Sequence, residues 1–358
     1  MTKEDIIKSF DPSQPGLADN SIYGLPFSAE QSEIIAIPIP WEVTCSYGGG
    51  TADGPAAILE ASYQVDLMHQ EFPELWKLGI YMEEIPENIY RQSAELKKKA
   101  EPIIKALEAG NNLKDLPDLL KSQNEINREC EKMSQWVEEK TSYWINQGKK
   151  VVLIGGDHST PLGYLKALAK IHQDFGILHM DAHIDFRVHY EGFLQSHASI
   201  MYNALKISQI SKFVMVGIRD FCEEEISVAT NEGERVKIHT NNDIRYASFS
   251  GETWRQRCEK IITALPQKVY ISFDIDGLLP WYCPHTGTPV PGGFSFEEAT
   301  YLISLLAESG KEIIGCDLVE VSPGEDDWDG NVGARLLFHL CGAMAKSNKM
   351  QTGEKVKL

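Results

Sequence analysis

Apolar runs rich in β-branched residues recur along the chain from Glu33 onward, and stretches of helical character separate them. Continuous apolar runs of this kind are typical of strands buried on both faces of a parallel sheet. Their alternation with helices predicts an α/β fold. Residues 76–81 are a weaker strand candidate, and the stronger ones are 34–39, 151–154, 175–180, 213–216, 236–238, 269–273 and 313–319.

Two segments lack this alternation. Residues 1–32 are polar and rich in Pro and Ser, which predicts an N-terminal arm. Residues 87–148 hold many Glu and Lys and no strand signal. In their second half, apolar side chains recur at near-helical spacing, at Ile126, Cys130, Met133, Val137 and Trp144. We therefore expect a helical insertion packed on the sheet of a single domain spanning 33–350.

Composition narrows the class of protein. Hydrophobic residues make up 42% of the 358 positions and charged residues 24%, which is ordinary globular usage and excludes a disordered chain. With 34 Lys and Arg against 52 Asp and Glu, the net charge of −18 argues against a surface that follows nucleic-acid phosphates or anionic lipid. Neutral or cationic small molecules are favoured as partners, although net charge reports first on solubility.

The cysteines and the N-terminus point to a reducing compartment. Seven scattered cysteines with no CxxC pair form neither a disulfide framework nor a thiolate zinc site. The first residues, MTKEDIIKSFDPSQPG, contain no apolar signal-peptide segment, and no run approaches the roughly 20 apolar residues of a membrane span. We expect a cytoplasmic protein.

Asp and His gather where three of the expected strands end. The run 151–154 leads into GGDHSTP, 175–180 leads into DAHID, and 269–273 leads into DIDG. In open α/β sheets, ligands bind at the carboxyl ends of the strands. Ser-Thr-Pro after the first of these strands is typical of a helix start, which places His158 on a tight strand-to-helix turn.

The three segments supply the donors of a metal site. Polar residues alternate within 181–185 and within 274–276, so on a continuing strand they would share one face. Carboxylates crowded at an apolar sheet end resist ionisation unless cations compensate them. Imidazole and carboxylate without thiolate suit Mn, Ni, Fe or Zn, and six ligands suit two ions about 3.5–4 Å apart. The candidate ligands are His158, Asp181, His183, Asp185, Asp274 and Asp276.

Each motif alone has an ordinary explanation. A DxD pair at a strand end recurs in many nucleotide enzymes, and GGDHS can be a capped turn. Isolated histidines are more often surface or core residues than ligands, and we interpret four of them in this way: His172, His179, His189 and His339. These ordinary explanations are much less convincing for three motifs that share one chemistry and follow successive strands.

The three motifs resemble the signatures of the ureohydrolase family, which includes arginase, agmatinase, formimidoylglutamase and guanidine hydrolases. The matching segments are GGDHS at 155–159, DAHID at 181–185 and SFDIDGLLPWYCPHTGTPVPGG at 272–293. The resemblance extends from about Glu33 to Ala345 and leaves the arm and the insertion outside. It implies a three-layer α/β/α fold with a mostly parallel sheet of about eight strands, and assembly as a homotrimer or homohexamer.

The resemblance also implies two divalent metal ions, with Mn²⁺ favoured and Ni²⁺ as the alternative. Two of the carboxylates, Asp181 and Asp274, would bridge both ions. The remaining ligands would be His158 and Asp185 for one ion, and His183 and Asp276 for the other.

Residues around the metal centre receive roles from the same resemblance. Asp185 would also contact the attacking water. Glu320, in DLVEVSP, would pair with the substrate guanidinium. His197, in QSHASI, falls where the family places a proton-shuttling His, and it or Asp185 would protonate the leaving amine. The alternative for His197 is an ordinary helix-start residue. Thr288 would lie in the second layer of the substrate site.

The third segment departs from the family pattern at two positions. Leu279 stands where Asp is usual, and His285 stands where a small residue is usual. The nearby Trp281 is bulky enough to shorten the pocket, and we expect Trp281 and His285 to contact substrate. The alternative is that the indole packs on its own loop or on a partner subunit.

A second expected pocket loop follows the first strand, at 41–50. Its glycines allow close backbone approach, and Thr44 offers a hydroxyl to a guanidinium N–H. Neither pocket loop carries a basic residue placed for an α-carboxylate. This weighs against arginine and favours agmatine or free guanidine.

These features predict a binuclear-metal hydrolase that cleaves a C–N bond of a small cationic guanidino compound and releases urea. The enzymatic alternatives are formimidoylglutamase, which would release formamide, and arginase. The non-enzymatic alternative is an inactive metal-binding member that acts in assembly or regulation.

Overall fold

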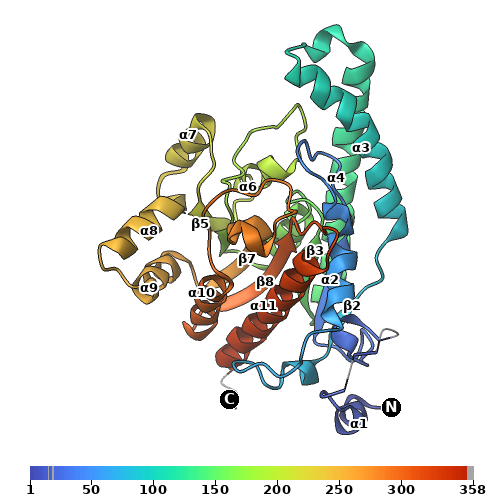
Figure 1. Cartoon of the computed structure of the whole chain (residues 1–358), viewed down its shortest axis with the longest axis vertical. Coiled ribbons are helices and arrows are strands. Elements are labelled where there is room, and N and C mark those ends of the chain that lie inside the picture. The colour runs from blue at the N-terminus through green and yellow to red at the C-terminus, as the bar shows by residue number, and fades with distance from the viewer. Residues whose placement is uncertain (15, 18–19, 353–358) are drawn as a thin grey trace.

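A single parallel sheet organises the molecule. The computed structural model describes residues 1–14, 16–17 and 20–352. Within them, eight strands form one sheet in which every neighbouring pair is parallel (Figure 1). Their order is β2-β1-β3-β8-β7-β4-β5-β6. Their bounds are β1 Ile34–Ile39, β2 Ile80–Met82, β3 Lys150–Gly155, β4 Phe175–Met180, β5 Ile210–Ile218, β6 Val236–Thr240, β7 Lys268–Asp274 and β8 Glu312–Val319.

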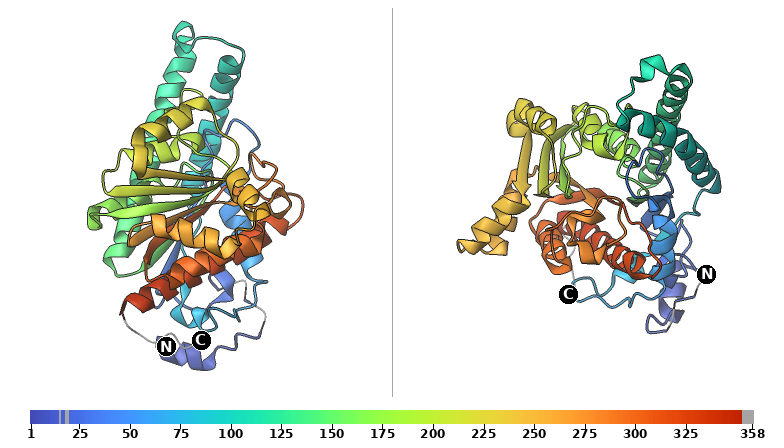
Figure 2. Two further views of the ribbon diagram at one scale, coloured as in Figure 1. Left: turned by 90° about the vertical axis from the view of Figure 1, so that its left-hand side faces the viewer. Right: turned by 45° about the horizontal axis from the view of Figure 1, so that its top comes forward.

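Helices cover both faces of this sheet (Figure 2). They are α1 Lys3–Ser9, α2 Gly54–Ser62, α3 Glu87–Glu108, α4 Pro117–Asn146, α5 Leu162–Ile171, α6 Ile200–Leu205, α7 Glu223–Glu232, α8 Asn241–Phe249, α9 Trp254–Ala264, α10 Phe296–Glu308 and α11 Trp328–Thr352. Alternate residues of β1 join different apolar clusters: Ile34 packs with α2, α10 and α11, whereas Ile35 packs with α3 to α6. The predicted three-layer α/β/α fold is confirmed.

The strand predictions agree closely with the sheet. All seven strong candidates lie in strands, several of which extend by one or more residues. The weaker candidate 76–81 is wrong over most of its length, because Leu75–Leu78 form a 3₁₀ turn and β2 begins only at Ile80. Gly79 separates the two with a φ of 72°, a conformation that glycine adopts without steric cost.

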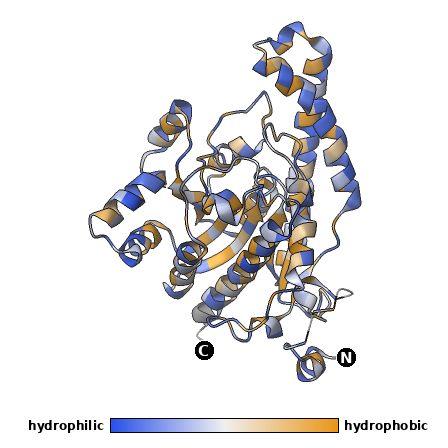
Figure 3. Ribbon diagram, in the orientation of Figure 1, coloured by the Kyte–Doolittle hydropathy of each residue, from blue (hydrophilic) through white to orange (hydrophobic). Residues whose placement is uncertain are grey.

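The segment 87–148 forms a long helical hairpin. Helices α3 and α4 lie against each other, and their connection projects beyond the sheet (Figures 1 and 2). Hydrophilic and hydrophobic residues alternate along the ribbon of the hairpin in Figure 3, and the five apolar residues spaced along α4 are all buried. Of the helices in the described ranges, none has the length and apolar character needed to cross a membrane.

The residues before β1 contribute to the core. Ile22, Leu25 and Phe27 are buried, and the buried Tyr23 donates a hydrogen bond from its hydroxyl to the carbonyl oxygen of Ala334 at 2.9 Å. This part of the expected arm therefore packs onto the domain. Positions 15, 18 and 19 of the arm lie outside the described residues.

Candidate metal centre and substrate cavity

Four neighbouring strands, β3, β8, β7 and β4, end at one place on the sheet edge. His158 follows β3, Glu320 follows β8, Asp274 ends β7 with Asp276 just beyond it, and β4 leads directly into 181–185. Carboxyl ends of parallel strands form the ligand-binding edge of an open sheet. The topology therefore gathers residues up to 162 positions apart, such as His158 and Glu320.

His158 is the centre of the first donor group. Its Nδ1 lies 3.1 Å from Asp181 Oδ2, 3.2 Å from Asp185 Oδ2 and 3.1 Å from Asp274 Oδ2. This nitrogen makes no well-aligned hydrogen bond to any described residue. Ligands at right angles around an ion, with bonds of about 2.1 Å, are about 3 Å apart. The four atoms are thus spaced as ligands of one divalent ion.

A second donor group shares Asp181 with the first. His183 Nδ1 lies 3.1 Å from Asp276 Oδ2 and 3.4 Å from Asp181 Oδ1. Because Asp181 directs one oxygen to each group, it is placed to bridge two ions. The second oxygen of Asp274 accepts a hydrogen bond from the backbone N–H of Asp276 at 2.9 Å. Six described residues at this edge therefore fit a pair of divalent cations.

The carboxylates perturb one another strongly. Burial, followed by the charges of Asp276 and Asp181, raises the pKa of Asp274 well above its usual value. Burial and the charge of Asp181 likewise raise the pKa of Asp185. Burial also opposes ionisation of Asp181, but His179 and His158 outweigh it and hold its pKa well below the usual range. Full ionisation of the group therefore requires added positive charge, which divalent ions supply.

The backbone is strained at two of these residues. Asp185 has a φ of 59° and Glu320 a φ of 63°, both in the left-handed region that non-glycine residues rarely adopt. Because β4 ends at Met180, residues 181–185 do not continue the strand. The chain instead turns at Asp185, and this turn returns the carboxylate to His158.

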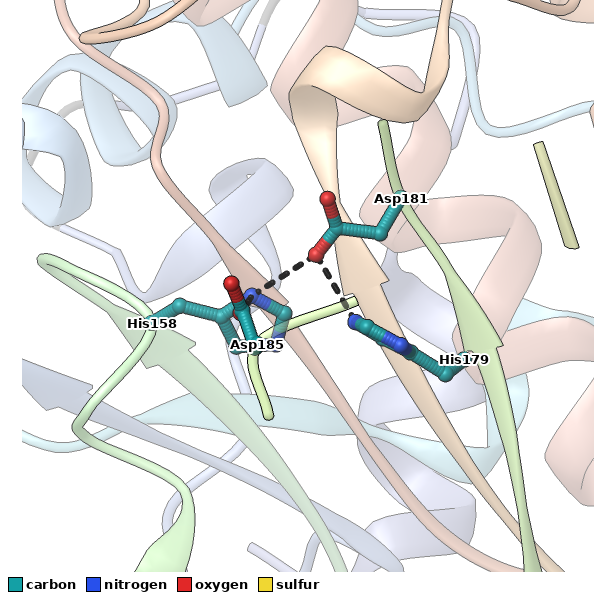
Figure 4. A group of neighbouring side chains, drawn as sticks. All are labelled: His158, His179, Asp181 and Asp185. Atoms are coloured by element: carbon teal, nitrogen blue, oxygen red, sulfur yellow. Dashed lines mark hydrogen bonds and ion pairs between the residues drawn. The ribbon is translucent and has the colours of Figure 1, made fainter. Parts of the chain in front are cut away.

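Sequence reasoning missed the role of His179. Its Nε2 lies 2.7 Å from Asp181 Oδ2, and its ring centroid is 5.3 Å from that of His158 (Figure 4). Buried imidazoles that contact a ligand carboxylate orient it for the metal. The available signal was spacing: His179 precedes Asp181 by two positions at the end of β4, so both side chains lie on the same face.

A buried chain of hydrogen bonds holds the ring of His158 at its other nitrogen. Its Nε2 lies 3.0 Å from Ser272 Oγ, which donates a hydrogen bond to Asp317 Oδ1 at 3.2 Å. Metal-binding histidines usually have such a partner on the ring nitrogen that faces away from the ion. This chain of hydrogen bonds fixes the ring so that Nδ1 faces the carboxylates.

A cavity of about 160 Å³ opens above the metal centre. Many small-molecule pockets are larger, roughly 300–1,000 Å³, so this cavity suits a small substrate. Three predicted residues outside the ligand set line it, namely His197, Thr288 and Glu320. Six residues without a predicted role also line it: Arg187, Tyr190, Ala198, Asp220, Phe221 and Glu225.

His197 and Glu320 have contrasting environments in this cavity. Burial, together with His183 and His158, lowers the pKa of His197 to about 4, so its imidazole is neutral at pH 7. Its Nδ1 has no hydrogen-bond partner among the described residues. Glu320 accepts a hydrogen bond from the backbone N–H of His158 at 2.8 Å. Burial, and then Asp157, raise the pKa of Glu320 well above its usual value.

Three predicted substrate contacts lie elsewhere. Trp281 is 63% exposed and outside the cavity lining, and its carbonyl oxygen accepts a hydrogen bond from Trp328 Nε1 at 2.8 Å. His285 Nδ1 lies 2.7 Å from Asp329 Oδ2. Thr44 is buried next to the cavity loops without lining the cavity. Within one chain, the indole therefore does not close the cavity.

Comparison with known proteins agrees with this geometry. The arginase family model matches residues 32–343. An N(1)-aminopropylagmatine ureohydrolase of Thermus thermophilus is 29% identical over 313 residues, covering 87% of this chain and 90% of that protein. An agmatinase of Bacillus anthracis is also 29% identical, over 311 residues that cover 87% of this chain and 91% of that protein. The solved agmatine ureohydrolase of Thermoplasma volcanium, at 22% identity, superposes with a TM-score of 0.70 over 97% of this chain and 99% of the other.

The fold and the paired His and Asp groups define a metal-dependent hydrolase. The chain belongs to the arginase family. It is thus a ureohydrolase-type enzyme that acts on the C–N bond of an amidine group.

Proposed function

We propose that this protein hydrolyses a small guanidino compound to urea and an amine or ammonia, with agmatine and free guanidine as the leading substrates. One observation carries the proposal: two donor groups share Asp181 on the floor of a small cavity that Glu320 also lines. Agmatinases and an aminopropylagmatine ureohydrolase among the relatives support it.

The candidate ligands would bind two metal ions. One ion would bind His158 and Asp185, the other His183 and Asp276, and both would share Asp181 and Asp274. When bound, two divalent ions supply an activated water at neutral pH. The surrounding carboxylates would hold the ions at the floor of the cavity.

Glu320 would bind the substrate guanidinium. Its carboxylate is buried beside the cavity, where a hydrogen bond to a cation is stronger than in water. The arriving positive charge also favours the ionised form of Glu320, whose pKa burial otherwise raises. Substrate charge and enzyme charge are therefore matched at this position.

His197 and Asp185 would handle the proton. The imidazole of His197 is neutral and lines the cavity, so it can accept a proton and pass it to the leaving nitrogen. Asp185 also lines the cavity, among the candidate metal ligands, and offers a second route. An amine leaves only after protonation, so one of the two must act.

The metal, the assembly and the compartment form part of the same proposal. A nitrogen and oxygen donor set suits Mn²⁺ first and Ni²⁺ as the alternative. The family resemblance supports a homotrimer or homohexamer. All seven cysteines are free, which agrees with a reducing cytoplasm.

Arg187 favours a second candidate, a substrate that carries a carboxylate. This residue is half-buried in the cavity wall, and its guanidinium stacks 5.1 Å from the Tyr190 ring without an ion pair to any described residue. A carboxylate on the substrate tail would pair with it. Arginine, guanidinobutyrate and formimidoylglutamate meet this requirement, whereas agmatine and guanidine do not.

A product assay tests both candidates. Mn²⁺- and Ni²⁺-loaded protein would be incubated with guanidine, agmatine, arginine, guanidinobutyrate and guanidinopropionate, and urea measured. Urea from guanidine or agmatine supports the first candidate, and urea only from the acids supports the second. Formamide from a formimidoyl substrate would identify formimidoylglutamase chemistry. No turnover in fully loaded protein would favour the inactive, metal-binding alternative.

A further inference from the structure

One wall of the cavity is a loop with few ties to the sheet. We define the 187–198 loop by its ends, where the backbone N–H of Arg187 donates to the carbonyl oxygen of Ala198 at 3.1 Å. This closure makes the segment a self-contained loop. It contributes Arg187, Tyr190, His197 and Ala198 to the cavity lining.

A tight turn at the tip of this loop needs external support. Tyr190 and Phe193 exchange backbone hydrogen bonds of 3.2 and 2.8 Å. Between them, Glu191 and Gly192 both have positive φ, 50° and 78°. A non-glycine residue in that region is costly, and it persists when surrounding contacts hold it.

Helix α4 of the hairpin provides that support. Asn127 Oδ1 accepts a hydrogen bond from the backbone N–H of Leu194 at 2.9 Å, and Asn127 Nδ2 donates to the carbonyl oxygen of Gly192 at 3.4 Å. One turn further along, Glu131 accepts a hydrogen bond from Gln195. From the other side, Asn203 donates to the carbonyl oxygen of Leu194 at 2.8 Å. The loop therefore lies between α4 and the short helix α6.

Helix α3 supports a second loop, 41–50, which does not line the cavity but lies against the turn that carries His158. The backbone N–H of Glu42 donates to Ser93 Oγ at 2.9 Å, and Lys97 Nζ lies 2.5 Å from Glu42 Oε1. The other oxygen of Glu42 accepts a hydrogen bond from the backbone N–H of Gly50 at 2.7 Å. Both side chains of the ion pair are mostly buried, so it fixes the loop more firmly than a surface pair would.

This loop lies next to the metal centre. Asp157, the residue before His158, donates its backbone N–H to the carbonyl oxygen of Trp41 at 2.8 Å. A β-carbon on Gly156 would lie only 2.0 Å from that same oxygen. Displacement of the loop would therefore reach the turn that carries His158.

We propose that the α3–α4 hairpin shapes the substrate cavity by holding both loops, with Asn127 and Lys97 as positioning residues. The expected change in KM rests on the proposed function, whereas the expected change in loop stability does not. Loss of a support lowers the fraction of molecules whose loop is competent to bind, and the apparent dissociation constant rises by the inverse of that fraction. The 187–198 loop carries none of the candidate metal ligands, so loss of Asn127 should leave metal binding unchanged.

Asn127→Ala is the main test, with Asn124→Ala as the matched control. Asn124 lies one turn before Asn127 on the same helix, is exposed, and makes no hydrogen bond to the loop among the described residues. Both variants would be loaded with Mn²⁺. We expect KM to rise about fivefold for Asn127→Ala, the effect of one hydrogen bond, with kcat changed less than about twofold. Metal content should stay at the wild-type value.

Hydrogen exchange gives a readout that is independent of turnover. In metal-loaded protein without substrate, the Leu194 amide should exchange about fivefold faster in Asn127→Ala than in Asn124→Ala. Asn127→Asp keeps the acceptor for this amide and should restore its protection. Lys97→Ala should leave Leu194 unchanged and accelerate exchange at Gly50.

The outcomes separate this inference from the proposed function. Equal exchange at Leu194 and equal KM in the two alanine variants would overturn it. Faster exchange without any change in KM would overturn its claim on substrate binding. If the wild type releases no urea from any substrate, the proposed function fails. Faster exchange confined to Leu194 or Gly50 would still show that the hairpin holds the loops.

Discussion

The floor and the wall of the cavity are built on different principles. The floor consists of ligands at the ends of neighbouring parallel strands, each placed by a motif of a few consecutive residues. The wall includes a loop whose position depends on contacts with a helical hairpin that is distant in sequence. Asn127 and Leu194, which form one of these contacts, are 67 positions apart. Short local motifs therefore place the candidate metal ligands, whereas contacts between distant segments shape the part of the cavity that would meet the substrate.

The largest expected effect breaks the floor. Asp181→Ala removes the carboxylate that directs oxygens to both donor groups. We expect loss of bound metal and a fall in urea release of at least about a thousandfold, because the nucleophile depends on both ions. Metal content by mass spectrometry and urea release check this.

The control for this variant is Asp174→Ala. Asp174 is exposed at the opposite end of the same strand, just before β4. It should keep full metal content and activity. If Asp181→Ala retained both metal ions, Asp181 would not bridge them.

Glu320→Gln tests the side chain that joins the two regions. The amide still accepts the His158 N–H but carries no charge for the guanidinium. We expect unchanged metal content and a fall in kcat/KM of about a hundredfold, the upper range for a hydrogen bond to a charged group. An unchanged kcat/KM for every guanidino substrate would exclude Glu320 from substrate binding.

His179→Ala examines the support beneath the floor. Removal of the imidazole that contacts Asp181 should weaken metal binding about 10–100-fold, with activity recovered at saturating metal. Metal titration by calorimetry measures the change. His189→Ala is the control, since that histidine is exposed. Equal metal affinity in both variants would mean that His179 is an ordinary core residue.

Sequence alone predicted the floor because its information is local. DAHID and DIDG follow apolar runs, and a parallel sheet places such segments side by side. The pattern could not predict the left-handed φ of Asp185, which returns its carboxylate to His158 after β4 has ended. The two-residue spacing between His179 and Asp181 was a usable signal, but an isolated histidine is more often a core residue than part of a metal site.

Prediction was incomplete at the wall: it placed His197 and Thr288 correctly but missed other residues, because loop geometry depends on tertiary contacts. Arg187 and Tyr190 follow DAHID in sequence but face the cavity only through the closure of the 187–198 loop and its hydrogen bonds to α4. Trp281 was assigned to the pocket from its bulk alone. In the structure it lies on a 3₁₀ turn beside Trp328, exposed to solvent.

Trp281→Ala should have the smallest effect of all. Because the indole lies outside the cavity of a single chain, the variant should retain the wild-type preference among guanidine, agmatine and arginine to within about twofold, as expected for an exposed residue away from the site. The same urea assay on the assembled protein checks this. A gain of tenfold or more with agmatine or arginine would show that the indole reaches substrate only after another subunit covers it. The wall would then depend on assembly as well as on the hairpin, and size-exclusion chromatography with light scattering on the same sample would identify the oligomer in which that happens.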